Sequence, residues 1–259
     1  MPASFAEGVP CWAECALPDP AAGRRFYGRL LGWTFHESPG DQAGQVRVGA
    51  EAFVDRQPAA ALVPPRAGLP PATWTVYFAT PDARALAGRV ERAGGHVVTG
   101  PEQDEDATRV LVTDPDGALF GLWQPGRHRG FRAVRSPGTY CWTEVHTRRP
   151  ELLDPFYEHV FGYTGTEPPA LRGYRLWSPE DARTGPDTAV TGREVMDAAV
   201  PAARPAHFLT YFRVEDCERA LASAVRLGGG VRTAPETMPY GTFATVTDDQ
   251  GTLFGLLSE

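Results

Sequence analysis

Strand-like and helix-like stretches follow one another in a fixed order at the start of the chain. Residues 11–17 alternate in a way that predicts a strand. Asp19 and Pro20 come next, a pair typical of the N-cap and the first position of a helix. The helix is predicted over 21–32, because apolar residues recur on one side and a glycine ends it. These residues are Ala22, Phe26, Leu30 and Gly32.

Three short strands are predicted after this helix, at 33–37, 45–49 and 58–63. The pattern then restarts with the strand "WTVYFAT" and a helix that begins at Asp82 and ends at Gly94. Three further strands follow it, "HVVTG", "RVLVT" and "LFGLWQ". The order strand–helix–strand–strand–strand, βαβββ, therefore occurs twice in the first half.

The second half of the chain repeats the first. The segment Cys11–Trp33 recurs as Cys141–Tyr163, and Tyr77–Glu102 recurs as Tyr211–Glu236, at offsets of 130 and 134 residues. The turn and strand "DPDGALFGLWQ" return as "DDQGTLFGLLSE" with the second offset. A tandem duplication is the simplest explanation. We predict a first domain at 9–125, a linker at 126–137 and a second domain at 138–257.

Two parts of the second half fit the repeat less well. Several Pro and Gly residues in 164–200 make its strands hard to place. Pro155 lies inside the third helix, so we expect that helix to begin near Leu153 rather than at Pro150.

The expected fold follows from the fact that one βαβββ unit has no partner layer to cover its sheet. Such a unit cannot bury its sheet alone, whereas two units form a curved eight-stranded mixed sheet with helices outside and a groove inside. Four units predict an α+β chain with two such sheets.

Composition narrows the class of protein. With 259 residues, 42% hydrophobic and 22% charged, the chain is typical of a soluble globular protein. A net charge of −7 without a basic cluster argues against nucleic-acid binding. No run of 18 apolar residues or signal peptide is visible, so we expect no membrane span and a cytoplasmic location. The four cysteines are expected to be buried free thiols, and surface positions are expected for His36, His96, His128 and His159.

The helix motif "DPAAGRRFYGRLLGW" and the final "DPDG" turn before an apolar strand make the chain similar to a known family. They resemble the vicinal oxygen chelate superfamily of glyoxalases, bleomycin-resistance proteins and extradiol dioxygenases. The resemblance is to its two-domain actinobacterial branch, which includes accessory proteins of aromatic polyketide antibiotic pathways. This fold hosts lyases, dioxygenases and plain binding proteins, so the resemblance implies the fold more than the function.

Enzymes of this superfamily hold a divalent metal with a histidine on a first strand and a glutamate on a last strand. Counted from the capping turns, the corresponding positions carry no ligand side chain. They are Trp12 and Trp142, Thr75 and Leu209, and Gly121 and Gly255. We therefore expect no metal and no other cofactor, which disfavours metal-dependent glyoxalase or dioxygenase chemistry. A two-residue shift in register would bring Glu144, His146 and His207 together as a two-histidine, one-carboxylate site.

Strand alternation assigns side chains to the two faces of each sheet. The residues expected under the helices in the first half are Ala13, Leu17, Val76, Phe78, Phe120 and Leu122. The glycines leave floor space for a flat molecule, beside tryptophans that form an aromatic wall. Glu14 and Glu144 are the candidate general bases. The predicted ligand-binding residues are Trp12, Glu14, Thr75, Tyr77, Gly121, Trp123, Trp142, Glu144, His146, His207, Leu209, Tyr211, Arg213 and Gly255.

These observations favour a metal-free protein that binds a hydrophobic polycyclic natural product, including one that bears an amino sugar, for antibiotic biosynthesis or self-resistance. An aromatic or polyketide ligand is the expected partner, with a biosynthetic oxygenase as a second. The alternative is a cofactor-independent hydroxylase, cyclase or isomerase that acts on an aromatic polyketide. Because the duplication supplies an interface within one chain, both a monomer and a homodimer are compatible with the sequence.

Overall fold

The computed structural model describes residues 5–37, 49–180, 187–238 and 240–259. The strand predicted at 45–49 lies outside the described residues apart from Gly49, which belongs to no strand. Among the helices described, none is long and apolar enough to cross a membrane.

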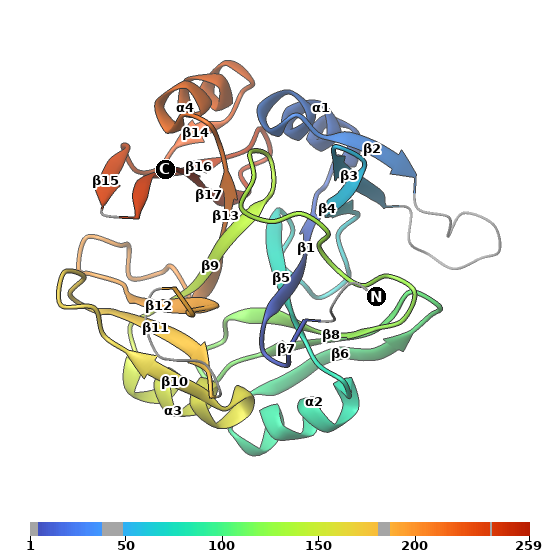
Figure 1. Cartoon of the computed structure of the whole chain (residues 1–259), viewed down its shortest axis with the longest axis vertical. Helices are drawn as coiled ribbons and strands as arrows, with labels where there is room; N and C mark the ends of the chain where they lie inside the picture. The colour runs from blue at the N-terminus through green and yellow to red at the C-terminus, as the bar shows by residue number, and fades with distance from the viewer. Residues whose placement is uncertain (1–4, 38–48, 181–186, 239) are drawn as a thin grey trace. The chain divides into compact units, whose positions relative to one another are not determined.

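The first half of the chain forms a mixed sheet of eight strands with two helices (Figure 1). The strand order is β2-β3-β4-β1-β5-β8-β7-β6. The elements are β1 (Pro10–Ala16), α1 (Pro20–Leu31), β2 (Thr34–Glu37), β3 (Ala50–Val54), β4 (Gln57–Val63), β5 (Thr73–Ala79), α2 (Ala83–Arg92), β6 (His96–Gln103), β7 (Ala107–Thr113) and β8 (Leu119–Pro125).

The second half forms a nine-stranded mixed sheet in the order β10-β11-β12-β9-β13-β17-β16-β14, and β15 pairs with β16. The predicted α+β fold with two mixed sheets is confirmed. The elements are β9 (Tyr140–Thr147), α3 (Pro150–Phe161), β10 (Tyr163–Thr166), β11 (Tyr174–Pro179), β12 (Thr191–Val195), β13 (His207–Arg213), α4 (Cys217–Arg226), β14 (Gly230–Val231), β15 (Glu236–Met238), β16 (Gly241–Thr247) and β17 (Leu253–Ser258).

The chain divides into two compact units that do not coincide with the two sheets. Unit 1 holds most of the second and third βαβββ repeats, and unit 2 holds most of the first and fourth. Unit 1 comprises Met1–Trp12, Val76–Gly130 and Thr143–Phe208. Unit 2 comprises Ala13–Thr75, Phe131–Trp142 and Leu209–Glu259.

The core of unit 1 lies between its strands and the helices α2 and α3, which are neighbours in Figure 1. Phe120 lies at its centre, with the ring of Phe78 at 5.7 Å and that of Tyr157 at 6.0 Å between centroids. Phe120 and Phe78 come from the sheet, and Tyr157 from α3. Four of the six residues predicted under the helices belong to this core, namely Val76, Phe78, Phe120 and Leu122. The other two, Ala13 and Leu17, are buried in unit 2.

A buried aspartate explains why the turn "DPDG" precedes β8. The carboxylate of Asp114 accepts hydrogen bonds from the backbone N–H groups of Asp116 and Ala118, both at 2.9 Å. Its second oxygen accepts one from the hydroxyl of Tyr157 on α3, also at 2.9 Å. The aspartate therefore closes the turn and ties it to the "FY" motif of a helix, since buried polar groups are stable only when they are paired.

Unit 2 builds the same device from the other two repeats. The carboxylate of Asp248 accepts from the N–H groups of Gln250 and Thr252, at 2.9 and 2.8 Å. The hydroxyl of Tyr27 on α1 donates to it at 3.0 Å. Each unit therefore combines the "FY" helix of one repeat with the aspartate turn of another.

Helix α3 differs from the prediction. It begins at Pro150 and contains Pro155, rather than beginning near Leu153. Pro155 leaves the carbonyl of Glu151 without a helical N–H partner, but both residues are exposed, where water can bond that carbonyl. The proline is therefore tolerated. The four cysteines, in contrast, are free and buried as predicted.

Candidate functional site

On the face of the first half that was predicted to hold a ligand, aromatic rings pack against one another. Trp12 and Trp123 lie 6.1 Å apart between ring centroids, and Tyr77 lies 5.6 Å from Trp123. All three belong to unit 1 and are no more than 3% exposed. Here the tryptophans are part of the core.

His128 and Arg109 cover these rings. The His128 ring lies 4.4 Å from Trp12 and 5.3 Å from Trp123, and its carbonyl accepts a hydrogen bond from the Trp123 indole. The Arg109 guanidinium lies 5.2 Å above the same indole, within cation–π range. The prediction that His128 is a surface residue was wrong, because it is half-buried on two indoles. The other three, His36, His96 and His159, are exposed as predicted.

Tyrosine rings occupy the space beside the strand glycines. Gly121 is paired with Tyr77, and a Cβ atom added to it would lie 2.1 Å from the tyrosine ring. Gly255 and Tyr211 repeat this arrangement with the same distance. The interpretation of these glycines as floor space for a ligand was wrong: they accommodate the protein's own tyrosines.

Glu14, a candidate base, has an arginine beside it. Its carboxylate is buried and accepts a hydrogen bond from Arg66 at 3.2 Å, within unit 2. Thr75, also expected at the ligand site, is buried too. Arg66 therefore compensates the negative charge of this buried carboxylate.

The second half presents a more open apolar surface, which we call the apolar patch. It consists of buried Cys141, Leu209 and Tyr211 with half-buried Trp142, Phe243, Leu253 and Leu257, all in unit 2. Arg213 lies two residues beyond Tyr211 on β13 and makes an ion pair with Glu259 at 2.5 Å. The predicted residues Trp142, Leu209 and Tyr211 thus come together.

A second set of side chains, the polar cluster, lies in unit 1: Glu144, His146, Tyr174 and Glu194. His146 Nε2 lies 3.0 Å from Glu144 Oε1 and 3.7 Å from Glu194 Oε2. The Tyr174 hydroxyl donates to Glu144 Oε2 at 2.5 Å. Glu144 and His146 alternate along β9, and the parallel register with β12 places Glu194 opposite His146.

His207 lies beside this cluster without joining its hydrogen bonds. Its ring stacks on His146 at 5.1 Å between centroids, and its Nδ1 lies 2.9 Å from the Pro205 carbonyl. Burial, reinforced by the neighbouring charge of His146, lowers the pKa of His207 to about 4. Burial also acts to lower the pKa of His146, but the hydrogen bond and charge of Glu144 outweigh it and raise that pKa. His146 is therefore the imidazole that more readily holds a proton.

Sequence reasoning missed three of these residues. Tyr174 and Glu194 lie in 164–200, where Pro and Gly obscured the strands. Phe243 could have been predicted, because the 134-residue offset makes it the counterpart of Arg109. Arg109 is paired with Trp123 on β8, and Phe243 is paired with Leu257 on β17.

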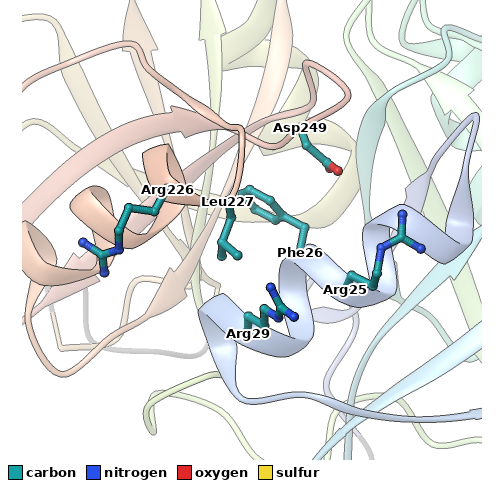
Figure 2. A pocket seen from close by; sticks show the side chains of 6 residues that line it. All are labelled: Arg25, Phe26, Arg29, Arg226, Leu227 and Asp249. Atoms are coloured by element: carbon teal, nitrogen blue, oxygen red, sulfur yellow. The ribbon is translucent and has the colours of Figure 1, made fainter.

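A shallow notch of about 190 Å³ lies between α1 and α4 in unit 2. Phe26 and Leu227 line its apolar part, and Arg25, Arg29 and Arg226 surround it (Figure 2). The Arg226 side chain points away from Arg29 in the figure and donates to Ser223 at 2.7 Å. Because these guanidinium groups do not converge, the notch lacks the geometry of an anion site.

These features can be compared with known proteins. A family model described as a glyoxalase-like domain matches residues 12–123. The chain belongs to this glyoxalase-like family, whose fold is that of the vicinal oxygen chelate superfamily. It is 35% identical to the Mycobacterium tuberculosis protein named "Putative glyoxylase CFP32", over 98% of this chain and 95% of that one. It is 33% identical to the anthracycline biosynthesis protein DnrV of Streptomyces peucetius, over 98% and 94%.

Solved structures of lower identity share the fold. The Mn(II)-bound glyoxalase from Novosphingobium aromaticivorans matches with a TM-score of 0.66 at 14% identity, over 98% of this chain and 83% of that one. The 2,3-dioxygenase LapB from Pseudomonas sp. KL28 matches with a TM-score of 0.65 at 16% identity, over 98% and 94%.

The metal that this superfamily implies does not fit the corresponding positions here. Trp12 and Trp142 offer indoles, Leu209 offers methyl groups, and the tyrosine rings fill the space beside Gly121 and Gly255. A metal needs at least three donor atoms placed together, and Thr75 supplies the single side-chain oxygen of the set. The side chains at these positions therefore do not form a metal site.

Proposed function

We propose that this protein binds a hydrophobic polycyclic natural product on the apolar patch, and that this binding does not use a metal at the family's usual positions. The half-buried state of Trp142, Phe243, Leu253 and Leu257 is the observation that carries the proposal. Four adjoining large apolar side chains that remain partly accessible are typical of a ligand surface. Relatives named anthracycline biosynthesis proteins support a fused-ring guest.

The expected affinity follows from the area that a guest would cover. Burying about 200 Å² of apolar surface contributes on the order of 5 kcal/mol. Stacking on Trp142 adds roughly 1 kcal/mol. These gains total about 6 kcal/mol before the loss of translational freedom is subtracted, so a dissociation constant weaker than micromolar is expected. Such a protein would hold a substrate or product for a biosynthetic oxygenase, or sequester it for self-resistance.

The test is a titration with an anthracyclinone, followed through quenching of tryptophan fluorescence and by calorimetry. Leu253→Asp places a charge in the apolar patch and should weaken binding at least about tenfold, a loss of 1.4 kcal/mol. Leu119→Asp is the matched control, because Leu119 is also half-buried and occupies the same position in the first half. Binding that is equally weakened by both variants, or by neither, contradicts the proposal.

A second candidate is acid–base catalysis on an aromatic polyketide. The hydrogen-bond chain from Tyr174 through Glu144 to His146 favours it, because such a chain can hold a proton and transfer it. In that case the guest would be converted to a product, and Glu144→Gln would abolish conversion while binding remained. Binding without any conversion would leave the first function alone.

A further inference from the structure

We propose that Glu144, His146 and Glu194 form a binding site for a divalent transition-metal ion, away from the positions that the family uses. Their donor atoms, one from each side chain, all lie within 4.8 Å of one another. None of the three lies at a position counted from the capping turns, and Glu194 takes the place of His207 in the set that a two-residue shift in register predicted. The proposed metal site shares no residue with the apolar patch.

The backbone fixes the directions from which two strands supply these donors. Glu144 and His146 come from β9, and Glu194 comes from β12, directly opposite His146 in the parallel register. Ligand bonds of about 2.1 Å require donor atoms about 3.0–3.4 Å apart. The distances from His146 Nε2, 3.0 Å to Glu144 and 3.7 Å to Glu194, are close to this range. The Glu194 side chain is 48% exposed, so a change of rotamer can close the remaining gap.

The donor set also has the right charge and chemistry. Two carboxylates neutralise a divalent ion, and a neutral imidazole adds a nitrogen ligand of the kind that Zn²⁺, Mn²⁺ and Fe²⁺ accept. Three protein ligands leave at least one position open for water or a ligand. The mixture of one imidazole with carboxylates makes the cluster different from a purely acidic surface.

The surroundings of Glu144 supply a second layer of support. The Tyr174 hydroxyl donates to the carboxylate oxygen of Glu144 that does not contact His146. Tyr174 can approach because Gly192 has no side chain: a Cβ atom there would lie 2.6 Å from the hydroxyl. A hydrogen bond that orients a ligating carboxylate is a typical feature of metal sites.

His207 forms one wall of the proposed site. Because the Pro205 carbonyl only accepts hydrogen bonds, the Nδ1 that lies 2.9 Å from it carries the proton. The lone pair of His207 is therefore on Nε2. The ring stacks on His146, which restricts how that imidazole can turn.

Calorimetric titration of the chelator-treated full chain with Zn²⁺ tests the site. We expect one equivalent to bind, with Tyr174→Phe weakening it about tenfold and His146→Ala or Glu194→Gln weakening it more. His159→Gln, at an exposed histidine on α3, is the control and should bind like the wild type. Far-ultraviolet circular dichroism verifies that each variant is folded.

X-ray absorption of the zinc-loaded chain gives an independent readout. It should show nitrogen and oxygen ligands with one imidazole and no sulfur. Zinc binding that survives His146→Ala, or a sulfur ligand, would overturn the site, and so would the absence of stoichiometric binding to the wild type. Repeating the anthracyclinone titration with and without chelator separates this outcome from failure of the proposed function.

Discussion

The two halves of the chain carry the same repeat and use the same sheet face differently. In the first half, Trp12 and Trp123 are buried beneath His128 and Arg109. In the second half, the counterparts of Trp12, Arg109 and Trp123 are Trp142, Phe243 and Leu257, and all three are half-buried. One copy of this face is core, and the other keeps its apolar side chains partly exposed.

The difference has a simple physical origin. A large indole at 123 and the cover supplied by His128 bury Trp12 in the first half. In the second half the smaller Leu257 leaves Trp142 and Phe243 less enclosed. Duplication thus allows one copy to bury this face in the core while the other copy keeps it partly exposed.

Adding a methyl group to the strand glycines should give the largest effect and test this contrast directly. Gly121→Ala should lower the free energy of unfolding by about 3 kcal/mol, because the enclosed Tyr77 cannot move away from the new Cβ. Gly255→Ala should cost only about 1 kcal/mol, because Tyr211 borders the more open patch. Chemical denaturation of both variants measures the difference, and equal losses would show that the two faces are equally rigid.

Removing the tyrosine hydroxyls should test what the halves have in common. Tyr157→Phe takes one hydrogen bond from a buried aspartate and should cost about 2 kcal/mol. Tyr27→Phe takes the equivalent bond and also the one that the Trp74 indole donates to this hydroxyl, so it should cost about 3 kcal/mol. Thermal unfolding of the two variants gives the comparison. A loss at one site without a similar loss at the other would mean that the two aspartate turns are not equivalent.

Removing the side chain that covers Trp12 and Trp123 should make the exposure of the two halves more alike. His128→Ala removes the ring that contacts two indoles and should cost about 1.5 kcal/mol. It should also shift tryptophan emission to longer wavelength and increase quenching by acrylamide, as Trp12 becomes accessible. His159→Gln is the control for loss of a histidine. Unchanged quenching would mean that other side chains keep the rings buried.

A change of pH should have the smallest effect on the free energy of unfolding. Burial raises the pKa of Asp114 to about 6, despite the hydrogen bonds that it accepts. Since this pKa is above the unfolded value near 4, the folded chain keeps the proton over a pH range in which the unfolded chain has lost it. The stabilisation of the folded state by protonated Asp114 is complete below about pH 4 and is lost as the pH rises through 6.

Between pH 7 and pH 5 the contribution of Asp114 should therefore grow by about 1 kcal/mol. Other carboxylates also titrate in this range, so the measurement is the difference between the wild type and Asp114→Asn in denaturant titrations at both pH values. A difference that is constant with pH would contradict a raised pKa.

Comparison of the chain with itself was enough to predict the repeat, and short-range signals were enough to predict the helices and most of the buried sheet positions. The Asp19–Pro20 cap, the glycine at 32 and the alternation around Phe78 and Phe120 each act within a few residues, so they can be read locally. The wrongly predicted start of α3 has a local cause too. Pro155 was overestimated as a helix breaker because exposure of the affected carbonyl is not visible in the sequence.

The tertiary structure alone decided which repeats share a core and what fills each sheet face. The partners of Asp114 and Asp248 are tyrosines 43 and 221 residues away. Whether a glycine accommodates a ligand or a neighbouring Tyr77, and whether Glu194 reaches His146, depends on registers between strands that no local pattern specifies. Side-chain patterns fix which face of an element is buried, but the groups that meet there are chosen by packing between distant segments.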